Sequence, residues 1–136
     1  MIEIMQRILI VDDDSNIRFM LSEAFRKTED EFQVVTAIDV QDALTKFEEA
    51  EFDLVITDFL MPGKNGIELV EEIRGRLDDP VPVIMITAFA SDELRSDNDR
   101  LDVFCCLDKP LKIGDIRQAA YDALEDRPPP ADEPIK

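Results

Sequence analysis

The chain contains no histidine, and its 136 residues include only two cysteines. Without histidine, Ser–His and Cys–His catalysis, histidine metal sites and histidine-based pH switching are excluded. Carboxylates and lysines must therefore do any chemistry. Cys105 and Cys106 are adjacent, so in a strand they point to opposite faces, and they form neither a CxxC motif nor a disulfide framework. This cysteine usage fits a reducing cytoplasm, which is the location we expect.

Positive charge is also scarce, because 15 Lys and Arg stand against 32 Asp and Glu, which gives a formal net charge of −17. Such a surface repels phosphate backbones and anionic lipids, so direct nucleic-acid binding by this domain is disfavoured. It favours basic partner patches and divalent cations instead. No apolar run approaches the roughly 20 residues that span a bilayer, and we expect no membrane association.

The length suits one domain, since single cores commonly reach roughly 100 to 200 residues. Five short hydrophobic runs are each followed by apolar residues at helical spacing. The runs are 7–11, 32–36, 53–57, 83–86 and 103–107, and the helical stripes cover 17–25 (with Ser15 as cap), 40–47, 67–73, 91–101 and 113–124. Strict alternation predicts an α/β fold, a parallel sheet with helices on both faces. Only Leu94 and Leu101 are strong apolar anchors in the fourth stripe.

The predicted domain covers residues 1–126. Residues 127–136 hold four prolines in ten positions and no apolar period, so we expect a proline-rich tail or the start of a linker there.

Polar residues with reactive side chains follow four of the five predicted strands. Asp12 and Asp13 follow the first strand, Asp58 the third, Thr87 ends the fourth, and Lys109 lies just past the fifth. In open α/β sheets, ligands bind beyond the carboxyl ends of the strands. In the flavodoxin-like order 2-1-3-4-5 the first and third strands are neighbours, so their carboxylates would converge. A hard divalent cation relieves that repulsion, and a partly hydrated Mg²⁺ is the expected occupant.

A carboxylate is a competent nucleophile toward phosphorus and forms an acyl phosphate. Phosphoryl transfer depends mostly on positioning and charge neutralisation, which Mg²⁺, an ammonium group and a hydroxyl can supply. Each residue alone is as well explained by capping or surface charge. Their joint placement on one rim favours phosphoryl transfer.

The sequence resembles the receiver domain of two-component response regulators over residues 7 to about 126. The segments that carry the resemblance are ILIVDDD at 8–14, DLVITDFLMPG at 53–63, IMITA at 84–88 and DKP at 108–110. The resemblance implies a flavodoxin-like doubly wound (βα)5 fold, and it also implies a bond between Lys109 and Pro110 that is often cis in this family.

The resemblance also implies roles for the rim residues. Asp58 would be the phosphoacceptor, Thr87 would contact the phosphoryl group, and Lys109 would pair with it. Asp12, Asp13, Asp58 and the main-chain oxygen of Leu60 would hold Mg²⁺. No other cofactor is expected. The protein would then be a signalling switch, which catalyses its own phosphoryl transfer and slow autodephosphorylation.

The partners that the resemblance implies are all proteins. The phosphodonor would be a phosphohistidine on a sensor histidine kinase or a phosphotransfer protein, which in this family often meets the first helix near Ile17 and Met20. Phosphorylation would switch binding of a downstream protein partner, or of an output domain in a longer chain, at the surface of helix 4, strand 5 and helix 5. The sequence leaves open whether phosphorylation drives formation of a homodimer.

Three positions depart from the family pattern. The family usually carries an aromatic residue or histidine where this chain has Cys106, and a small thiol cannot swing in and out of a pocket. We expect Phe104, which should share a side of the strand with Cys106, or movement of the fourth helix to take part of that role. Leu60 and Phe89 are apolar where they would flank the pocket, so water should be poorly positioned for attack, and self-dephosphorylation should be slow.

Three other interpretations fit less well. Asp12-x-Asp14-x-Asn16 mimics an EF-hand loop, but Ile17 stands where that loop needs glycine. A haloacid-dehalogenase-type phosphatase would resemble Asp-x-Asp-Gly-Thr, whereas Asp14 is followed by Ser15. A pure protein-interaction module would have no need of the complete rim set.

Overall fold

The computed structural model describes residues 5–26 and 32–125. The predicted tail at 127–136, and with it the domain boundary at 126, lies outside the described residues. Strands and helices alternate through the described part: β1 (Gln6–Val11), α1 (Ser15–Arg26), β2 (Phe32–Ala37), α2 (Val40–Glu49), β3 (Leu54–Asp58), α3 (Gly66–Arg74), β4 (Val83–Thr87), α4 (Asp92–Arg100), β5 (Cys105–Asp108) and α5 (Ile113–Glu125).

The strands form one parallel sheet in the order β2-β1-β3-β4-β5. This order confirms the predicted flavodoxin-like doubly wound fold. All residues of β3 and β4 are buried, as expected for strands that are covered on both faces. The chain adds β2 on one side of β1 and the later strands on the other side, so the direction of strand addition reverses between β1 and β3. The loops that follow β1 and β3 therefore lie side by side at the carboxyl edge of the sheet.

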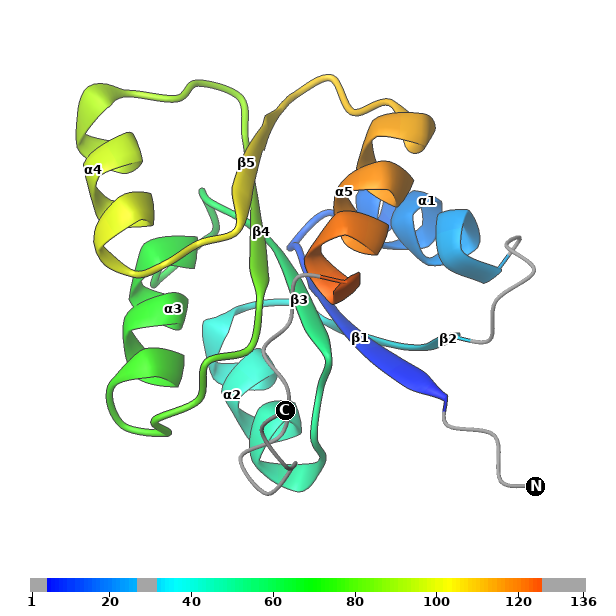
Figure 1. The fold of residues 1–136 in the computed structure, drawn as a ribbon, viewed down its shortest axis with the longest axis horizontal. Helices are drawn as coiled ribbons and strands as arrows, with labels where there is room; N and C mark the ends of the chain where they lie inside the picture. Colours follow the sequence, from blue (N-terminus) through cyan, green and yellow to red (C-terminus); the bar gives the residue numbers. More distant parts are fainter. Residues whose placement is uncertain (1–4, 27–31, 126–136) are drawn as a thin grey trace, which may run out of the picture.

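Helices cover both faces of the sheet (Figure 1), with α1 and α5 on one side and α2, α3 and α4 on the other. Successive residues of β1 alternate between the two cores: Ile8 and Ile10 pack with α1 and α5, whereas Leu9 and Val11 pack with the opposite helices. Because side chains along a strand alternate with a period of two, one continuous hydrophobic run supplies both cores.

The ends of two elements differ from the sequence prediction. Asp14, not Ser15, caps α1, since its carboxylate accepts a hydrogen bond from Asn16 N at 2.8 Å and its carbonyl accepts one from Arg18 N at 3.0 Å. The fifth strand begins at Cys105 instead of Val103, because the Val103 amide donates to the Asn98 carbonyl of α4 at 2.9 Å.

The predicted side of Phe104 is wrong. Phe104 packs with the core under α1 and α5, whereas Cys106 packs with the core under α2, α3 and α4. Phe104 precedes the strand, so the alternation of side chains does not extend to it. It therefore does not share a side with Cys106. Cys105 and Cys106 do lie on opposite faces, as predicted.

Candidate functional site

Three carboxylates meet at the carboxyl edge of the sheet. One oxygen from each of Asp12, Asp13 and Asp58 lies within 4.8 Å of the other two. Asp12 directly follows β1 and is 1% exposed, and Asp58 ends β3 and is 5% exposed, while Asp13 faces solvent. The convergence that the strand order predicts is therefore present.

Three hydrogen bonds hold Asp12. Its amide donates to the Ala37 carbonyl at 3.1 Å, and its Oδ1 accepts from Asp14 N at 2.9 Å. Its main-chain oxygen accepts from Arg18 Nη1 at 2.8 Å. Its Oδ2 is buried and has no hydrogen-bond partner. A buried carboxylate oxygen is costly without a donor or a cation, so this atom fits a ligand of positive charge.

Lys109 supplies positive charge next to Asp58. Its Nζ lies 3.2 Å from Asp58 Oδ1, and its amide donates to the Thr87 carbonyl at 2.8 Å. The bond between Lys109 and Pro110 is cis, as the resemblance implied. The ends of β3, β4 and β5 are thereby joined at one point.

Burial is the main influence on the two buried carboxyl groups. It raises the pKa of Asp58, and Lys109 opposes that rise by its charge and by a hydrogen bond. Burial likewise raises the pKa of Asp12, which the negative charge of Asp58 raises further. Both groups therefore hold a proton more readily than an exposed aspartate does, and a bound cation would reverse this tendency.

Thr87 lies at the same edge, but its hydroxyl is engaged locally. Its Oγ1 donates to the Phe89 carbonyl at 3.0 Å and accepts from Phe89 N at 3.1 Å. Thr87 is 4% exposed. The predicted contact with a phosphoryl group would require the hydroxyl to leave this turn, and it stays a prediction.

Two large apolar side chains lie close in sequence to the site residues. Leu60, two residues after Asp58, is 75% exposed, and Phe89, two residues after Thr87, is 78% exposed. Apolar side chains offer water no hydrogen bonds, so neither Leu60 nor Phe89 can hold a water molecule for attack on a group bound at Asp58. The metal-binding role of the Leu60 main-chain oxygen stays a prediction.

Gly66 supports the backbone of the site, a role that the sequence reasoning missed. A Cβ at this residue would lie 2.6 Å from the main-chain oxygen of Asp58 and 2.8 Å from Met85 Sδ. Gly66 N also donates to the Phe59 carbonyl at 2.7 Å. Glycine thus lets the start of α3 press against the backbone that carries Asp58. The only sequence signal is a glycine directly before the predicted helical stripe at 67–73.

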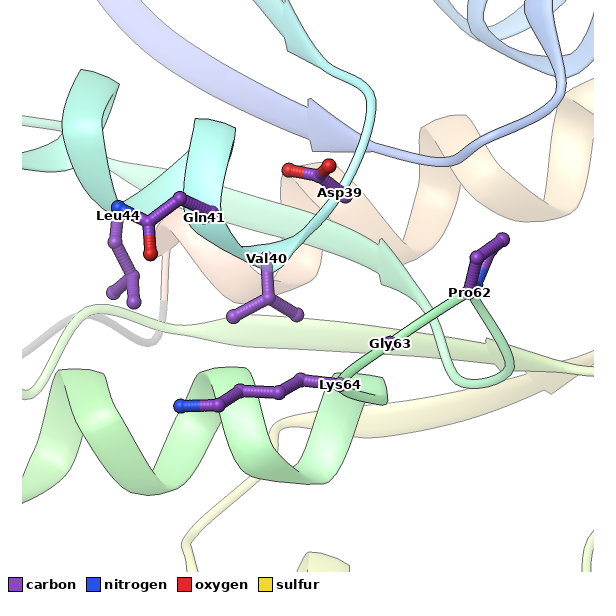
Figure 2. A pocket seen from close by; sticks show the side chains of 7 residues that line it. All are labelled: Asp39, Val40, Gln41, Leu44, Pro62, Gly63 and Lys64. Carbon is purple, nitrogen blue, oxygen red and sulfur yellow. The ribbon is translucent and has the colours of Figure 1, made fainter.

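A hollow of about 190 Å³ lies between the start of α2 and the loop after β3 (Figure 2). Asp39 and Lys64 are its charged lining residues. The carboxylate of Asp39 caps α2 by accepting from Asp42 N at 2.8 Å. The hollow contains none of the three clustered carboxylates, so it is separate from the site described above.

The fold is that of a known family. Residues 8–121 match the family model of the response regulator receiver domain, and the chain belongs to this family. Receiver domains are the signalling switches of two-component systems. Within residues 5–26 and 32–125, no helix has the length and apolar character needed to cross a membrane.

Curated relatives differ in how much of them the chain covers. It is 33% identical over 115 residues to sporulation initiation phosphotransferase F of Bacillus subtilis, a match that covers 84% of this chain and 90% of that protein. It is 34% identical over 119 residues to the regulatory protein AtoC of Escherichia coli, a match that covers 88% of this chain and 25% of that protein. The chain thus spans most of the first relative and a quarter of the second.

Solved structures agree with the fold. Chemotaxis protein CheY4 of Vibrio cholerae superposes with a TM-score of 0.82 at 30% identity, covering 89% of this chain and all of the other. Response regulator TrrA of Thermotoga maritima, solved in complex with Mg²⁺ and BeF, has a TM-score of 0.74 at 33% identity, covering 88% of this chain and all of TrrA.

Proposed function

We propose that this receiver accepts a phosphoryl group on Asp58 from the phosphohistidine of a sensor histidine kinase or phosphotransfer protein, and that phosphorylation changes which protein it binds. The observation that carries this proposal is the cluster of three carboxylates with Lys109 Nζ 3.2 Å from Asp58. Asp58 is the member of the cluster that pairs with a cation of the protein itself.

The proposed transfer uses side chains of the site described above. An oxygen of the Asp58 carboxylate forms the new P–O bond while the P–N bond to the donor histidine breaks, and the imidazole nitrogen keeps the electron pair of that bond. Lys109 then pairs with the phosphoryl oxygens. The Thr87 hydroxyl, released from Phe89, donates to another phosphoryl oxygen.

Asp12, Asp13, Asp58 and the main-chain oxygen of Leu60 would hold Mg²⁺. The unpartnered Oδ2 of Asp12 and the all-oxygen donor set support a hard divalent cation. When bound, Mg²⁺ would neutralise negative charge on the carboxylates and on the transferred group.

Intact-protein mass spectrometry tests the proposal. Wild type and Asp58→Asn are incubated with acetyl phosphate, with and without Mg²⁺. We expect one phosphoryl adduct on wild type that requires Mg²⁺ and that is missing from Asp58→Asn. Folded, magnesium-bound wild type without an adduct would contradict the proposal and favour an interaction module.

We also propose that α4 carries the signal in place of the missing aromatic switch. Of its nine residues only Leu94 and Asn98 are buried, so little apolar area holds it to the sheet. Burial raises the pKa of the Cys106 thiol and the Asn98 side chain opposes that rise, while Asn98 Oδ1 is buried without a partner. A polar contact with one unsatisfied atom is a weak attachment.

The two ends of α4 are held differently. At its C-terminal end, Arg74 donates to the Leu101 carbonyl at 2.9 Å and to the Asp102 carbonyl at 3.3 Å. The same guanidinium donates to the carbonyls of Asp79 and Val81 at 2.9 and 2.7 Å. This arrangement favours a pivot about the Arg74 end, with the larger displacement near Thr87.

Amide hydrogen exchange tests the pivot. Phosphorylation should change exchange in residues 88–98 more than in residues 100–104, and Asp58→Asn treated with the same donor should show no change. Equal exchange in α4 before and after phosphorylation of wild type would contradict this role.

The phosphodonor is expected at the groove between α1 and α5. Phe19, 65% exposed, lines this groove together with Met20, Ile113 and Arg117. The net charge of −17 favours a partner with basic residues around the contact. Slow autodephosphorylation, from the exposed Leu60 and Phe89, would preserve the activated state between contacts with the two partners.

A further inference from the structure

Arg18 makes a hydrogen bond whose role the reaction described above does not explain. It lies in the first turns of α1, and its Nη1 donates to the main-chain oxygen of Asp12 at 2.8 Å. The side chain is partly buried. The helix that carries it is itself fastened to the same loop, because Asp14 caps α1.

The atom that Arg18 contacts belongs to the peptide group that joins Asp12 to Asp13. A peptide group is planar, so a guanidinium that holds its oxygen also limits where its nitrogen and the Cα of Asp13 lie. Within residues 5–26 and 32–125, no hydrogen bond holds the carboxylate of Asp13, whose side chain is exposed. The position of Asp13 therefore depends on this peptide.

The same bond completes the restraint of Asp12. The Asp12 amide is held by Ala37, its Oδ1 by Asp14 and its main-chain oxygen by Arg18. Only Oδ2 is left, and it has no partner. The like charges of three carboxylates within 4.8 Å favour spreading of this loop when no cation is bound. A charge-assisted hydrogen bond to the backbone opposes such spreading.

We propose that Arg18 is a positioning residue for divalent-cation binding: it holds the peptide between Asp12 and Asp13 so that both carboxylates are aligned before the cation arrives. This inference rests on the proposed magnesium site. Arg18 does not touch the cation or the phosphoryl group. It lowers the cost of ordering the loop, and its effect should appear as affinity for the cation.

The test compares Arg18→Met with Arg26→Met. Arg26 is in the last turn of the same helix, and its side chain, 63% exposed, forms an ion pair with Glu23 at 3.3 Å. Both variants lose one positive charge, but only Arg18→Met loses the contact with Asp12. Mg²⁺ affinity is measured by isothermal titration calorimetry and by the rise in melting temperature on titration with Mg²⁺.

We expect Arg18→Met to bind Mg²⁺ about tenfold more weakly than wild type, the size of effect seen when a group that orients a metal ligand is lost. Arg26→Met should bind like wild type. Acetyl phosphate labelling of Arg18→Met should need more Mg²⁺ for half-maximal rate and reach the wild-type rate at saturation. Equal affinities of the two Met variants would overturn the inference.

Two further variants keep the outcomes separate. If Arg18→Met does not fold, Arg18→Gln replaces it, since a glutamine side chain stays polar but is two atoms shorter than arginine and loses the contact with the Asp12 carbonyl, and wild-type affinity in Arg18→Gln would overturn the inference. Asp12→Asn tests the proposed site itself. If wild type and Asp12→Asn bind Mg²⁺ equally, the magnesium site is wrong and the inference falls with it, whereas loss of affinity in Asp12→Asn but not in Arg18→Met overturns the inference alone.

Discussion

Replacing Asp12 by asparagine should make the metal-free protein more stable. At 4.8 Å, the upper limit of separation in the cluster, two unit charges repel by about 0.9 kcal/mol in water and by about 3.5 kcal/mol at an effective dielectric constant of about 20. Asp12→Asn removes this repulsion with both Asp13 and Asp58, and it also removes the attraction to Lys109. After this loss and screening by salt, we expect a gain of about 1 to 3 kcal/mol in the free energy of unfolding.

The substitution keeps the local hydrogen bonds. The amide oxygen of asparagine can still accept from Asp14 N, which now donates to Asp12 Oδ1 at 2.9 Å. The amide nitrogen can replace the buried Oδ2, which has no partner, and donate to a neighbouring carboxylate. The change in stability is therefore dominated by charge.

Urea unfolding at pH 7 in EDTA, followed by circular dichroism, measures this gain. The control is Asp99→Asn, which removes one charge from an exposed position of α4 and should change stability by less than about 0.5 kcal/mol. With saturating Mg²⁺ the stability advantage of Asp12→Asn over wild type should shrink or reverse, because the bound cation stabilises wild type. An Asp12→Asn protein that is no more stable than Asp99→Asn in EDTA would refute the reasoning.

The buried carboxyl groups of Asp12 and Asp58 should also make the stability of the metal-free protein depend on pH. Because burial raises the pKa of Asp12 and Asp58 in the folded protein, the native state keeps protons that the unfolded chain has released. Without metal, these groups should make stability fall as pH rises from about 4, the ordinary value for aspartate, through their raised pKa values, and change no further above them. The loss of unfolding free energy with rising pH should be smaller in Asp12→Asn than in wild type, as measured by urea unfolding at several pH values in EDTA.

Three further outcomes follow from particular contacts. Leu60→Asn combined with Phe89→Glu should shorten the lifetime of the acyl phosphate, measured as the decay of the phosphoryl adduct by mass spectrometry, and an unchanged lifetime would count against slow autodephosphorylation caused by these side chains. Gly66→Ala should lower the free energy of unfolding in urea by about 3 kcal/mol, because its Cβ would lie 2.6 Å from the main-chain oxygen of Asp58. The control Gly114→Ala has no atom within 4 Å of the new Cβ and should be neutral or stabilising. Equal costs in the two variants would show that the contact at Gly66 is relieved elsewhere. Arg74→Met leaves four backbone carbonyls without their donor and should lower stability by about 2 to 3 kcal/mol, and a loss below about 0.5 kcal/mol would mean that water replaces the guanidinium.

The helix at 91–101 shows how local signals can suffice where hydrophobic periodicity is poor. Its predicted apolar anchors were only Leu94 and Leu101, and both are buried. The helix still forms, because the Ser91 side chain caps it by accepting from Leu94 N, and Asp92 and Glu93 place negative charge in its first turn. These features are legible in the sequence without any tertiary contact.

The position of Phe104 shows the opposite case. The alternation of side chains predicts the face on which Phe104 lies only if the strand includes Phe104. The strand begins later, because the Val103 amide donates to the Asn98 carbonyl instead of to the sheet. Asp102, just before it, has a φ of 55°, which turns the chain at this point. Where a strand begins depends on the end of the preceding helix, so the sequence pattern alone could not place Phe104.

The sequence by itself determined the sheet and the rim residues. Five buried runs alternating with helical stripes leave few topologies, and residues at strand ends share an edge in any of them. Only the tertiary structure decided which neighbours support the site: the Arg18 bond to the Asp12 backbone and the close approach of Gly66 to Asp58. Such contacts depend on side-chain rotamers and on the exact path of loops, which hydrophobic periodicity does not encode.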